Sequence, residues 1–510
     1  MAAVLTWLAE QVSGRGSAEA LVDGGHRLTF AQLDDSASAV AAWVSAAGIG
    51  AGDRVGLACD NSASFVAAYL GILRTGAVLV PLNPTAPPGV LESIAEDTGM
   101  RLLVTDNPSR LGVSVPPGDV QQLDLPAVSP GTWSAPHLFL APLATSGADG
   151  PIVPEFGAPA DLQAIIFTSG TTGRPKGVML TASALQRVAE AGCEMLSLDS
   201  SDRVGIITPL FHLYALREVD AALRVGACLV LARNLTFPAS VLRQLHQERV
   251  TYLSGVPAGF ALFVERYERL LAGCGDHLRA ITLGTATCPP ALAAALHELL
   301  PSTRVILTYG LTEASRVCYR VTGEATDKTG SIGRPYPGVE LRTVDEEGRA
   351  LPANTPGRIV FRTGMAASGY WNRGSATQSL QLADRWMLSP DYGRIDEDGN
   401  LFLRGRVDDV INSGGEKVSP DEVEAAIREH PQVADCAVLS AADPNGHLGE
   451  IVLAVIVSSA GSSLAAEEVT QFCAARLEQH KVPRAIRFVE SLPRTALGKV
   501  DRGRLRAAGV

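Results

Sequence analysis

The chain has 510 residues, too many for a single hydrophobic core, and roughly two to four structural units are expected. Hydrophobic residues make up 46% and charged residues 19%, as in an ordinary globular protein. The 54 acidic residues outnumber the 43 basic ones, and the formal net charge of -11 argues against broad nucleic-acid binding and against an anionic membrane surface. An anionic ligand must therefore be held by local groups.

The sequence has none of the usual signals of a secreted or membrane-spanning protein. Residues 1–14 lack the basic start and unbroken apolar run of a signal peptide. The longest apolar stretch, residues 65–82, is interrupted by Arg74, Thr75 and Gly76, so we expect no membrane span. The eight cysteines show no Cys-x-x-Cys pair and no zinc-ligand spacing, which favours buried thiols in a reducing compartment. A cytoplasmic location is therefore expected.

The first part of the chain alternates short apolar runs with helical patterns. Strands are expected at residues 54–57, 78–81 and 102–105, and again at residues 164–167, 204–208, 227–231, 251–254, 280–283 and 305–308. Residues 107–160 are rich in Pro, Gly and Ser and predict a long irregular connection between the two halves. Such alternation predicts an α/β fold with two doubly wound, mostly parallel sheets, each covered by helices.

The composition changes after Ser331. Segments at residues 339–343, 357–361 and 401–403 have β-rich patterns with turn signals and predict a small barrel-like subdomain. Beyond Gly405, Ser419 caps a predicted helix that ends at His430-Pro431, and strands are expected at residues 436–439, 451–457 and 485–489. The predicted division is a large domain of residues 1–404 and a small α+β domain of residues 405–510.

The most informative motif follows the strand expected at residues 164–167. It reads Thr168-Ser169-Gly170-Thr171-Thr172-Gly173-Arg174-Pro175-Lys176-Gly177. Glycines let backbone N–H groups face a ligand, hydroxyls add donors, and Lys176 adds a positive charge, so the run suits a polyphosphate. It is not a Walker A sequence, because Pro175 precedes the lysine and Gly177 follows it. A flexible loop without function is the alternative.

This run resembles the phosphate loop of the adenylate-forming enzymes, the superfamily of acyl-CoA synthetases, peptide-synthetase adenylation domains and luciferases. Four further stretches match at family-typical order and spacing, so the resemblance covers nearly the whole chain from Leu28 to Arg504. The pattern is most like that of the AMP-forming acid–thiol ligases. The resemblance implies ATP and Mg²⁺ as cofactors, coenzyme A as co-substrate, and a small C-terminal domain that moves.

The second matching stretch is Tyr309-Gly310-Leu311-Thr312-Glu313, at the end of an expected sheet strand, where ligands bind in open α/β sheets. By resemblance, Tyr309 stacks on adenine with Gly310 beside it, Thr312 lies near the α-phosphate, and Glu313 holds Mg²⁺. Carboxylate and phosphate oxygens are natural ligands of that ion. Taken alone, the stretch could be a simple strand-to-loop turn.

The third stretch runs from Trp386 to Arg406. Asp391 resembles the carboxylate that accepts both ribose hydroxyls, and Arg406 resembles its partner near the ribose and phosphate. This chain has Ser389-Pro390-Asp391 where the family usually has Thr-Gly-Asp. Because Pro390 fixes φ and removes a donor, the local backbone is expected to differ. A surface Asp in a β-turn is the alternative.

The fourth and fifth stretches lie in the small domain. Asp408 matches the hinge of the superfamily, and Gly414 and Gly415 match the segment that lines a tunnel for the thiol; an Asp-rich turn and a Gly-rich loop are the alternative. Lys499, in Pro493-Arg494-Thr495-Ala496-Leu497-Gly498-Lys499, matches the lysine that bridges the carboxylate and the α-phosphate. An exposed Lys in such a turn is usually only solvated, but the resemblance makes Lys499 the candidate catalytic residue together with Thr168.

Weaker signals concern the acid. His212, in Pro209-Leu210-Phe211-His212-Leu213-Tyr214, matches a residue that gates between the two reaction stages, although a lone His after a strand is more often structural. Tyr214 and Ser315 are candidates for the acyl pocket. Gly284, Thr285 and Ala286 occupy the adenine-side loop of the family. Arg217 and Arg316 fall in the same segments, and the sequence leaves their direction open.

The function predicted is adenylation of a hydrophobic fatty, aryl or polycyclic acid and transfer of its acyl group to CoA. Amino acids are disfavoured, because no acidic residue stands early in residues 211–214 to hold an α-amino group. A stand-alone enzyme that loads an acyl carrier protein is the first alternative. A non-catalytic nucleotide-binding regulator is the second, and luciferase-like oxygenation is a remote third. A homodimer and a role in secondary metabolism stay open.

Overall fold

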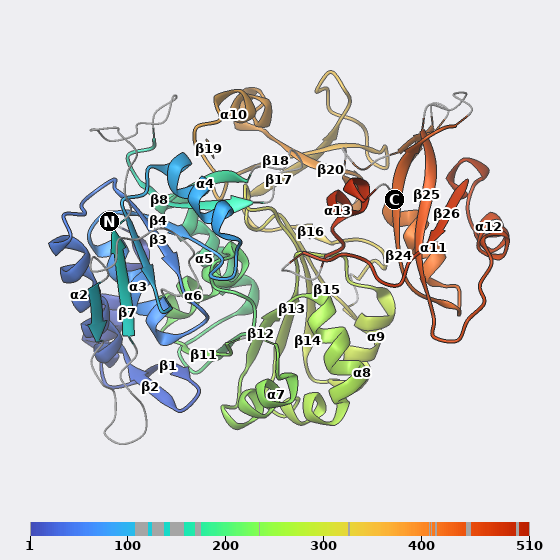
Figure 1. The fold of residues 1–510 in the computed structure, drawn as a ribbon. Helices are drawn as coiled ribbons and strands as arrows, with labels where there is room; N and C mark the ends of the chain where they lie inside the picture. The colour runs from blue at the N-terminus through green and yellow to red at the C-terminus, as the bar shows by residue number, and fades with distance from the viewer. Residues whose placement is uncertain are drawn as a thin grey trace. The chain divides into compact units, whose positions relative to one another are not determined.

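The computed structural model describes residues 2–107, 121–124, 137–142, 158–168, 175–233, 235–324, 327–406, 409, 411–413, 416–444, 450–495 and 499–508. Contacts divide the chain into two compact units (Figure 1). Unit 1 comprises Met1–Thr329, Pro335–Val339 and Arg362–Gln381, and unit 2 comprises Gly330–Arg334, Glu340–Phe361 and Leu382–Val510. Within the described ranges no helix has the length and apolar character needed to cross a bilayer.

The first sheet of unit 1 has a parallel centre and antiparallel edges, in the strand order β19-β9-β8-β4-β3-β5-β7-β6. Its strands are β3 (Arg54–Ala58), β4 (Val78–Pro81), β5 (Leu102–Thr105), β6 (Gln121–Asp124), β7 (His137–Pro142), β8 (Leu162–Thr168), β9 (Lys176–Thr181) and β19 (Gly369–Tyr370). Strands β8 and β9 form an antiparallel pair in which Thr168 lies opposite Lys176. The predicted phosphate loop therefore joins the two strands of a hairpin.

The second sheet of unit 1 has the strand order β16-β15-β14-β13-β12-β10-β11-β1-β2 and is parallel from β14 through β1. Its strands are β1 (Glu19–Asp23), β2 (His26–Thr29), β10 (Arg203–Ile206), β11 (Cys228–Leu231), β12 (Tyr252–Gly255), β13 (Ala280–Leu283), β14 (Arg304–Tyr309), β15 (Cys318–Val321) and β16 (Arg334–Pro335). The parallel strands β10 to β14 bring their carboxyl ends to one edge, and the loops of the candidate site leave from that edge.

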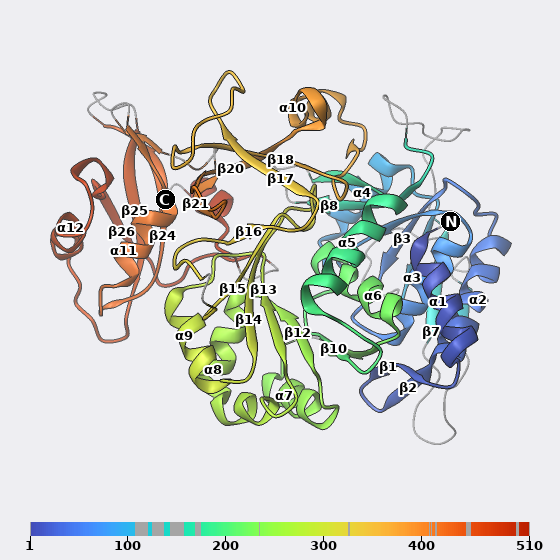
Figure 2. The ribbon, with the colours of Figure 1, turned by 180° about the vertical axis from the view of Figure 1, so that it is seen from behind.

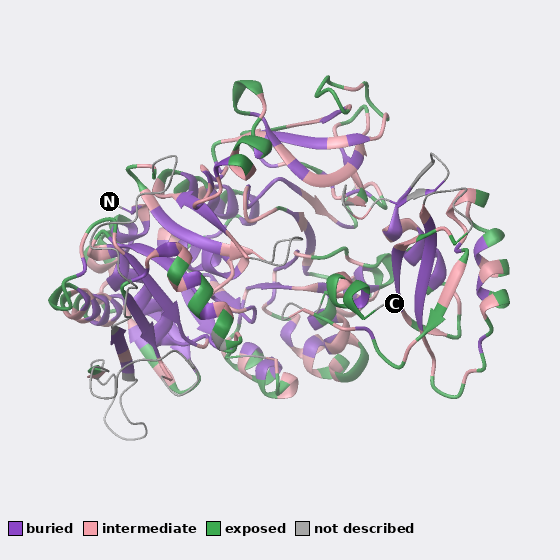
Figure 3. Cartoon of the chain, turned by 45° about the horizontal axis from the view of Figure 1, so that its top comes forward, coloured by how far each residue is buried: buried purple, intermediate pink, exposed green. Residues whose placement is uncertain are grey.

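Some helices of unit 1 lie between its two sheets, and others cover the outer face of one sheet or the other (Figures 1 and 2). They are α1 (Ala3–Arg15), α2 (Phe30–Ala46), α3 (Ala63–Arg74), α4 (Pro88–Thr98), α5 (Ala182–Leu196), α6 (Leu213–Val225), α7 (Pro238–Gln247), α8 (Pro257–Cys274), α9 (Pro290–Leu299) and α10 (Gly374–Leu380). Helix α3 contacts β3 and β4 of one sheet and β1 of the other, and its residues 63–73 are all buried. This buried layer joins the two sheets of unit 1 into one core. Figure 3 colours each described residue by its burial.

The structure corrects two expectations about these sheets. Strand β8 was expected beside the later strands but pairs with β4 of the first sheet, since sheet membership depends on pairing between distant segments. Residues 121–124 and 137–142, expected as irregular, form the antiparallel pair β6 and β7 at the edge of that sheet. The Pro, Gly and Ser residues around these strands predict a loop, although such residues are tolerated near the edge strands of a sheet.

Unit 2 contains three further sheets. The first has the order β17-β18-β20-β21, is antiparallel where β18 pairs with β20 and β20 with β21, and lies where the small barrel-like subdomain is expected. The remaining strands form the pair β22-β23 and the sheet β24-β25-β26. The strands are β17 (Val339–Val344), β18 (Gly357–Thr363), β20 (Met387–Ile395), β21 (Leu401–Arg406), β22 (Ile411–Ser413), β23 (Glu416–Val418), β24 (Val433–Ala442), β25 (Glu450–Ser458) and β26 (Ala485–Phe488).

The helices of unit 2 are α11 (Pro420–Arg428), α12 (Ala466–Ala474) and α13 (Arg502–Ala507), with short turns of 3₁₀ helix at Ala383–Arg385 and Gln479–Lys481. The expected cap is confirmed, because the Ser419 hydroxyl accepts a hydrogen bond from the Glu422 backbone N–H. Val423, Ile427, Val438 and Val452 pack in the core of this α+β part. The predicted α/β fold class and the α+β end of the chain are thus confirmed. A moving boundary between residues 404 and 405 stays a prediction.

Candidate active site

The candidate site of unit 1 lies at the carboxyl ends of β12, β13 and β14. These strands are parallel neighbours, with Gly255 beside Leu283 and Leu283 beside Leu307 in register. The loops that follow them are therefore adjacent, and one of them carries residues 284–286 and another residues 309–313. This is the edge at which open parallel sheets bind their ligands. Two of the motifs expected to hold the nucleotide thus leave from neighbouring strands.

A tight turn follows Tyr309, which is buried at the end of β14. The backbone folds back so closely that a Cβ on Gly310 would lie 1.9 Å from the carbonyl oxygen of Ser315. The Ser315 N–H donates to the Leu311 carbonyl at 2.6 Å, and Ser315 has a φ of 55°. Glycine is required at position 310 for steric reasons. The turn leaves Thr312 and Glu313 half-buried at the edge of the sheet.

Three residues from distant parts of the chain meet beside this turn. The Tyr370 hydroxyl donates a hydrogen bond to Glu313 Oε1 at 2.6 Å, and the Lys176 ammonium lies 5.5 Å from the centre of the Tyr370 ring. The Ala367 N–H also donates to the Glu313 carbonyl at 2.7 Å. Strand β19 places Tyr370 here, because it pairs with β9 through Gly369 and Met179. The carboxylate expected to hold Mg²⁺ and the lysine of the phosphate loop thus share one aromatic neighbour.

The phosphate loop begins and ends within this region. Thr168 and Lys176 are both half-buried, and the Thr168 hydroxyl lies 3.5 Å from the Lys176 carbonyl oxygen. The predicted ligand-binding residues between them fall outside the described residues; they are Ser169, Gly170, Thr171, Thr172 and Gly173. The two ends of the loop therefore lie close to the Tyr370 and Glu313 pair.

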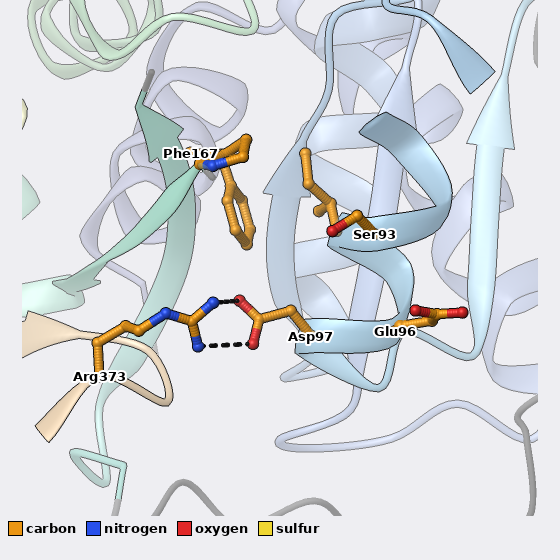
Figure 4. A pocket seen from close by; sticks show the side chains of 7 residues that line it. Ser93, Glu96, Asp97, Phe167 and Arg373 are labelled. Carbon is orange, nitrogen blue, oxygen red and sulfur yellow. Dashed lines mark hydrogen bonds and ion pairs between the residues drawn. The ribbon is translucent and has the colours of Figure 1, made fainter. Parts of the chain in front are cut away.

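A cavity of about 400 Å³ lies beside the base of the same hairpin (Figure 4). It is lined by Ser93, Ile94, Glu96, Asp97, Phe167, Pro175 and Arg373. The Arg373 guanidinium forms a two-pronged ion pair with the Asp97 carboxylate at 3.0 and 3.1 Å, and the Trp371 indole N–H donates to the Asp97 carbonyl. These contacts tie α4 to the segment after β19, so they support the hairpin from behind.

The loop that carries His212 is anchored to the first sheet's side of unit 1 by Asn61. The Asn61 amide donates to the Thr208 carbonyl at 2.8 Å and accepts from the Leu210 N–H at 2.8 Å. His212 is half-buried and precedes the first residue of α6. Buried Asn61, which our sequence analysis did not single out, therefore fixes the position of the predicted gating residue.

Tyr214 closes this side of the site. Its ring packs directly on the backbone at Gly284, where a Cβ would approach the ring to 2.6 Å, and its hydroxyl makes long hydrogen bonds of 3.3 Å to the Gly255 and Thr282 carbonyls. Thr285 has a φ of 69°, and Ala286 is exposed. The predicted adenine-side loop and one predicted acyl-pocket residue are thus brought together.

Arg217 and Arg316 turn inward rather than toward solvent. Both guanidinium groups contact the buried Glu218 carboxylate, at 3.2 Å and 3.1 Å, and Arg217 also lies over the Tyr214 ring at 4.4 Å. Arg217 Nη1 donates to the Ser315 carbonyl at 3.1 Å. We call Arg217, Glu218 and Arg316 the buried arginine cluster; it lies directly behind both predicted acyl-pocket residues.

Asp391 in unit 2 lies on β20, opposite Arg406 of β21 in the backbone register. The residue before it, Pro390, lies at an irregularity, because the pairing of β18 with β20 shifts between the pairs of Val360 with Leu388 and Arg358 with Tyr392. A proline cannot donate to the ladder, which is the physical reason for the bulge. The Ser389 hydroxyl accepts from the Asp391 N–H at 2.8 Å and supports the carboxylate's backbone.

Lys499 is exposed and lies at the base of a closed loop in unit 2, at the backbone hydrogen bond that shuts the loop. The loop is shut by Thr495 N–H to the Lys499 carbonyl at 2.8 Å and by Asp501 N–H to the Pro493 carbonyl at 2.7 Å. Helix α13 follows at once, and its Arg502 pairs with Glu424 and Asp421 of α11. The predicted hinge Asp408 and the predicted thiol-tunnel residues Gly414 and Gly415 lie outside the described residues.

Comparison with known proteins identifies the family. Residues 8–371 match the AMP-binding enzyme family, and residues 422–499 match its C-terminal domain. The chain is 32% identical, over 96% of each sequence, to a methyl-dioxo-octahydro-indenyl propanoyl:CoA ligase of Rhodococcus jostii. It is also 30% identical to a feruloyl-CoA synthase of Amycolatopsis, over 98% of each sequence. The chain belongs to the AMP-binding enzyme family.

Solved structures of the AMP-binding family agree with this fold. The o-succinylbenzoate CoA synthetase of Bacillus subtilis, in complex with the acyl-adenylate OSB-AMP, has a TM-score of 0.82 and 27% identity over 98% of this chain and 97% of that one. The anthranilate CoA ligase AuaEII with anthranoyl-AMP has a TM-score of 0.80 and 27% identity, over 99% and 96%. The predicted adenylate-forming enzyme with a two-domain fold is confirmed.

Among the residues that the sequence analysis did not find, Tyr370 has the clearest place in this site of the AMP-binding family fold. It stands 57 positions from Glu313 in the chain, so local pattern gave no reason to connect them. The signal in the sequence is Gly369-Tyr370-Trp371, an aromatic pair after a glycine. The structure gives this glycine a φ of 140°. Such a glycine marks a special backbone position and could have drawn attention to the tyrosine.

Proposed function

We propose that this protein is an ATP-dependent carboxylic acid–CoA ligase that forms an acyl-adenylate and then an acyl-CoA. The observation that carries the proposal is the meeting of Glu313, Tyr370 and Lys176 at the end of the phosphate loop, with Tyr309 one turn away. A carboxylate can bind the counter-ion of a nucleoside triphosphate, and a phenol and an ammonium group can bind its phosphate oxygens. The curated relatives named as CoA ligases support the same reaction.

The first half-reaction joins the acid to AMP. A carboxylate oxygen of the acid attacks the α-phosphorus, the bond from that phosphorus to the bridging oxygen breaks, and pyrophosphate leaves. Thr168, Ser169 and Thr172 cradle the phosphates, Thr312 lies by the α-phosphate, and Lys499 places a positive charge on the developing anion. Tyr309 stacks on adenine beside Gly284, Thr285 and Ala286, while Asp391 and Arg406 hold the ribose.

Glu313 fits a magnesium ion that arrives with the nucleotide. Its Oε1 accepts the Tyr370 hydrogen bond, which holds the carboxylate in one orientation. Within the described residues, no three His, Cys, Asp or Glu side chains gather as a protein-built metal site. Magnesium is commonly held by one or two carboxylates together with substrate phosphates, and when bound it would offset the charge of the phosphate oxygens.

The second half-reaction transfers the acyl group to CoA. The thiol sulfur bonds to the acyl carbon, the bond from that carbon to the AMP oxygen breaks, AMP leaves with the electron pair, and the thiol proton passes to water. In our proposal the small domain turns about Asp408, withdraws Lys499, and brings Gly414 and Gly415 to the thiol, while His212 gates its path. Two uses of one site require two domain orientations.

The direct test follows each half-reaction separately. Purified enzyme, ATP and magnesium are incubated with a panel of acids, and acid-dependent exchange of labelled pyrophosphate into ATP reports adenylation. Mass spectrometry after addition of CoA or of an acyl carrier protein reports the acceptor. We expect exchange with at least one acid and a CoA thioester; the absence of exchange with every acid would contradict the proposal. Transfer only to the carrier protein would correct the acceptor.

Lys499→Ala separates the two stages. Adenylation should fall by about a hundredfold or more, the size typical for a group that stabilises transition-state charge. Thiolation of preformed acyl-adenylate should change little. Lys481→Ala is the matched control, because Lys481 also lies in unit 2 but pairs with Glu422 and Glu478.

A homodimer, a cytoplasmic location and a role in secondary metabolism are further parts of the proposal.

A further inference from the structure

The buried arginine cluster contains two positive charges and one negative charge. Arg217, Glu218 and Arg316 are 4%, 0% and 1% exposed. Among the described residues no other carboxylate pairs with either arginine. Burial keeps the pKa values of Tyr252 and Tyr336 above normal, although Arg316 and Arg217 oppose the rise at Tyr336. Burial also raises the pKa of the Cys193 thiol to about 11, so these groups are neutral near pH 7. The cluster therefore has a net charge of about +1.

The packing of the cluster is tight and specific. Arg316 lies along α5, where its Nε donates to the Val188 carbonyl at 3.2 Å and a Cβ on Gly192 would meet its Nη2 at 2.5 Å. Arg217 is held on its other side by the Ser315 carbonyl and the Tyr214 ring. Because these contacts fix both guanidinium groups, they are not free to turn toward solvent.

Several buried polar atoms of the cluster nevertheless lack a hydrogen-bond partner among the described residues. Arg217 Nη2, Glu218 Oε2 and the Ser315 hydroxyl are sealed from solvent and have no hydrogen-bond partner among the described residues. Arg316 Nη1 and the Tyr336 hydroxyl lie close without a hydrogen bond of normal geometry. A buried donor without a partner destabilises the folded protein, and a charged donor does so more strongly. Such a set indicates a missing ligand more readily than a finished structural ion pair.

The position of the cluster connects it to the acid. Arg217 stacks on Tyr214 and bonds to the backbone of Ser315, the two predicted acyl-pocket residues, and Glu218 follows Tyr214 by one turn on α6. Tyr214 is half-buried, and its hydroxyl makes only long hydrogen bonds, of 3.3 Å to the Gly255 and Thr282 carbonyls. Because the Tyr214 ring lies over the Arg217 guanidinium, a rotation of this ring would open a path from the site to Arg217.

We propose that the acid carries a second anionic oxygen group at the end away from the reacting carboxylate, and that Arg217, with Arg316 and Ser315, binds this group behind Tyr214. The inference rests on the proposed function for the identity of the pocket. The substrate is then an apolar acid with a second carboxylate, in place of a purely hydrophobic acid. A second carboxylate supplies the negative charge and the acceptors that the cluster lacks.

Matched acid pairs test this without knowledge of the natural substrate. The probes are hexanoate and adipate, benzoate and terephthalate, and 3-phenylpropanoate and 3-(4-carboxyphenyl)propanoate. Thermal protection of the protein reports binding of each acid, and pyrophosphate release reports turnover. We expect the diacid of at least one pair to bind more tightly and to exceed its monoacid in kcat/KM by about tenfold, as for one charge-assisted contact.

Variants of Arg217 assign the preference to the cluster. Arg217→Met leaves Glu218 with Arg316 as a one-to-one pair, so the diacid preference should disappear while KM for ATP stays unchanged. Arg217→Lys should keep part of the preference, since it keeps the charge. Arg224→Met is the matched control on the same helix, because Arg224 contacts Trp7 and Glu190 instead.

The outcomes separate this inference from the proposed function. Turnover of monoacids as well as or better than diacids would overturn the inference and leave the ligase in place. A diacid preference that survives in Arg217→Met would also overturn it, as would equal protection by chloride alone. If no acid is turned over, the ligase assignment fails, and binding still decides the inference: protection by a diacid that Arg217→Met abolishes supports it, and the lack of any diacid protection contradicts it.

Discussion

Each unit of the molecule contains a glutamate contacted by two arginines, and the two sets differ in how completely they are satisfied. In unit 2, Glu424 uses both oxygens: Oε2 pairs with Arg428 at 2.9 Å, and Oε1 pairs with Arg502 at 2.5 Å and accepts the Val438 N–H at 2.9 Å. In unit 1, Glu218 uses one oxygen for both Arg217 and Arg316, and its other oxygen has no partner among the described residues.

The surroundings differ in the same direction. The side chains of Arg428 and Arg502 are 45% and 22% exposed, whereas that of Arg316 is fully buried. Arg502 also pairs with Asp421, and Arg506 of the same helix pairs with Asp409, so negative charge is at hand in unit 2. Among the described side chains of Glu424, Arg428 and Arg502, one buried polar atom, Arg502 Nε, has no hydrogen-bond partner. The two sets therefore have the same residue types, and they differ in burial and in how many of their hydrogen bonds are made.

The largest expected effect comes from removing each glutamate. Glu218→Gln leaves two buried guanidinium groups without a counter-charge and should destabilise unit 1 by about 3–5 kcal/mol. Glu424→Gln should cost only about 1–2 kcal/mol, because Arg428 and Arg502 reach solvent and other carboxylates. Hydrogen–deuterium exchange of α6 and α11, measured in both variants, reports each unit separately. Equal loss of protection in the two helices would break the distinction.

The second effect concerns one carboxyl group with a raised pKa in each unit, the buried Asp220 and the partly exposed Asp421. Asp220 of α6 accepts a hydrogen bond from the Tyr69 hydroxyl at 2.8 Å, and burial raises its pKa to about 7. In the unfolded chain an Asp loses its proton near pH 4, so between about pH 4 and about pH 7 only the folded state holds that proton. Stability should therefore fall as pH rises through this window, by about 1.4 kcal/mol per pH unit, and become level above it.

Asp220→Asn tests that sign, because the amide keeps the size of the side chain and an acceptor for Tyr69. The variant should melt at a temperature that changes less than the wild-type value between about pH 5 and about pH 7.5. Asp421→Asn is the counterpart in unit 2, where burial and the neighbouring Glu424 raise the Asp421 pKa and Arg502 opposes the rise. Parallel melting curves for wild type and Asp220→Asn would show that Asp220 is already ionised.

The sequence predicted the elements well and their distant partners poorly. The strands expected at residues 78–81, 102–105 and 280–283 coincide with β4, β5 and β13, because each is a short buried apolar run between turn signals. Strand β8 was given the wrong sheet, and the contact of Arg316 with Glu218 spans 98 positions in the chain. No local pattern holds that information, since three-dimensional neighbours are set by packing.

The same limit applies to the candidate site. Motif resemblance indicated Tyr309, Glu313 and Lys176 separately, but their common neighbour Tyr370 emerged only from the pairing of β19 with β9. Asn61 was missed for the same reason, because its partners Thr208 and Leu210 lie on another sheet's loop. Residues that bind a ligand directly leave a motif, whereas residues that position them are identified by contact.

The third effect moves from stability to catalysis. Arg502 of α13 pairs with Glu424 and Asp421 of α11, three positions after Lys499. Arg502→Met should loosen the base of the Lys499 loop and lower the rate of adenylation by about tenfold for every acid alike, as expected for a lysine held less exactly in place. Arg217→Met should instead change the ranking of acids. Adenylation rates for one monoacid and its matched diacid in both variants check this. A change in the ranking of the acids in Arg502→Met would contradict a role of Arg502 in positioning Lys499 alone.

The smallest effect sets the baseline for counting ion pairs. Arg349 contacts two carboxylates, Asp345 at 2.7 Å and Glu347 at 2.9 Å, as many as Arg502 does, but its side chain is 74% exposed. Water already solvates these charges, so Arg349→Ala should change stability by less than about 0.5 kcal/mol and leave adenylation unchanged. Thermal melting at low and high salt together with the exchange assay checks this. A loss comparable to that of Glu424→Gln would mean that contact number, and not burial with incomplete satisfaction, ranks these clusters.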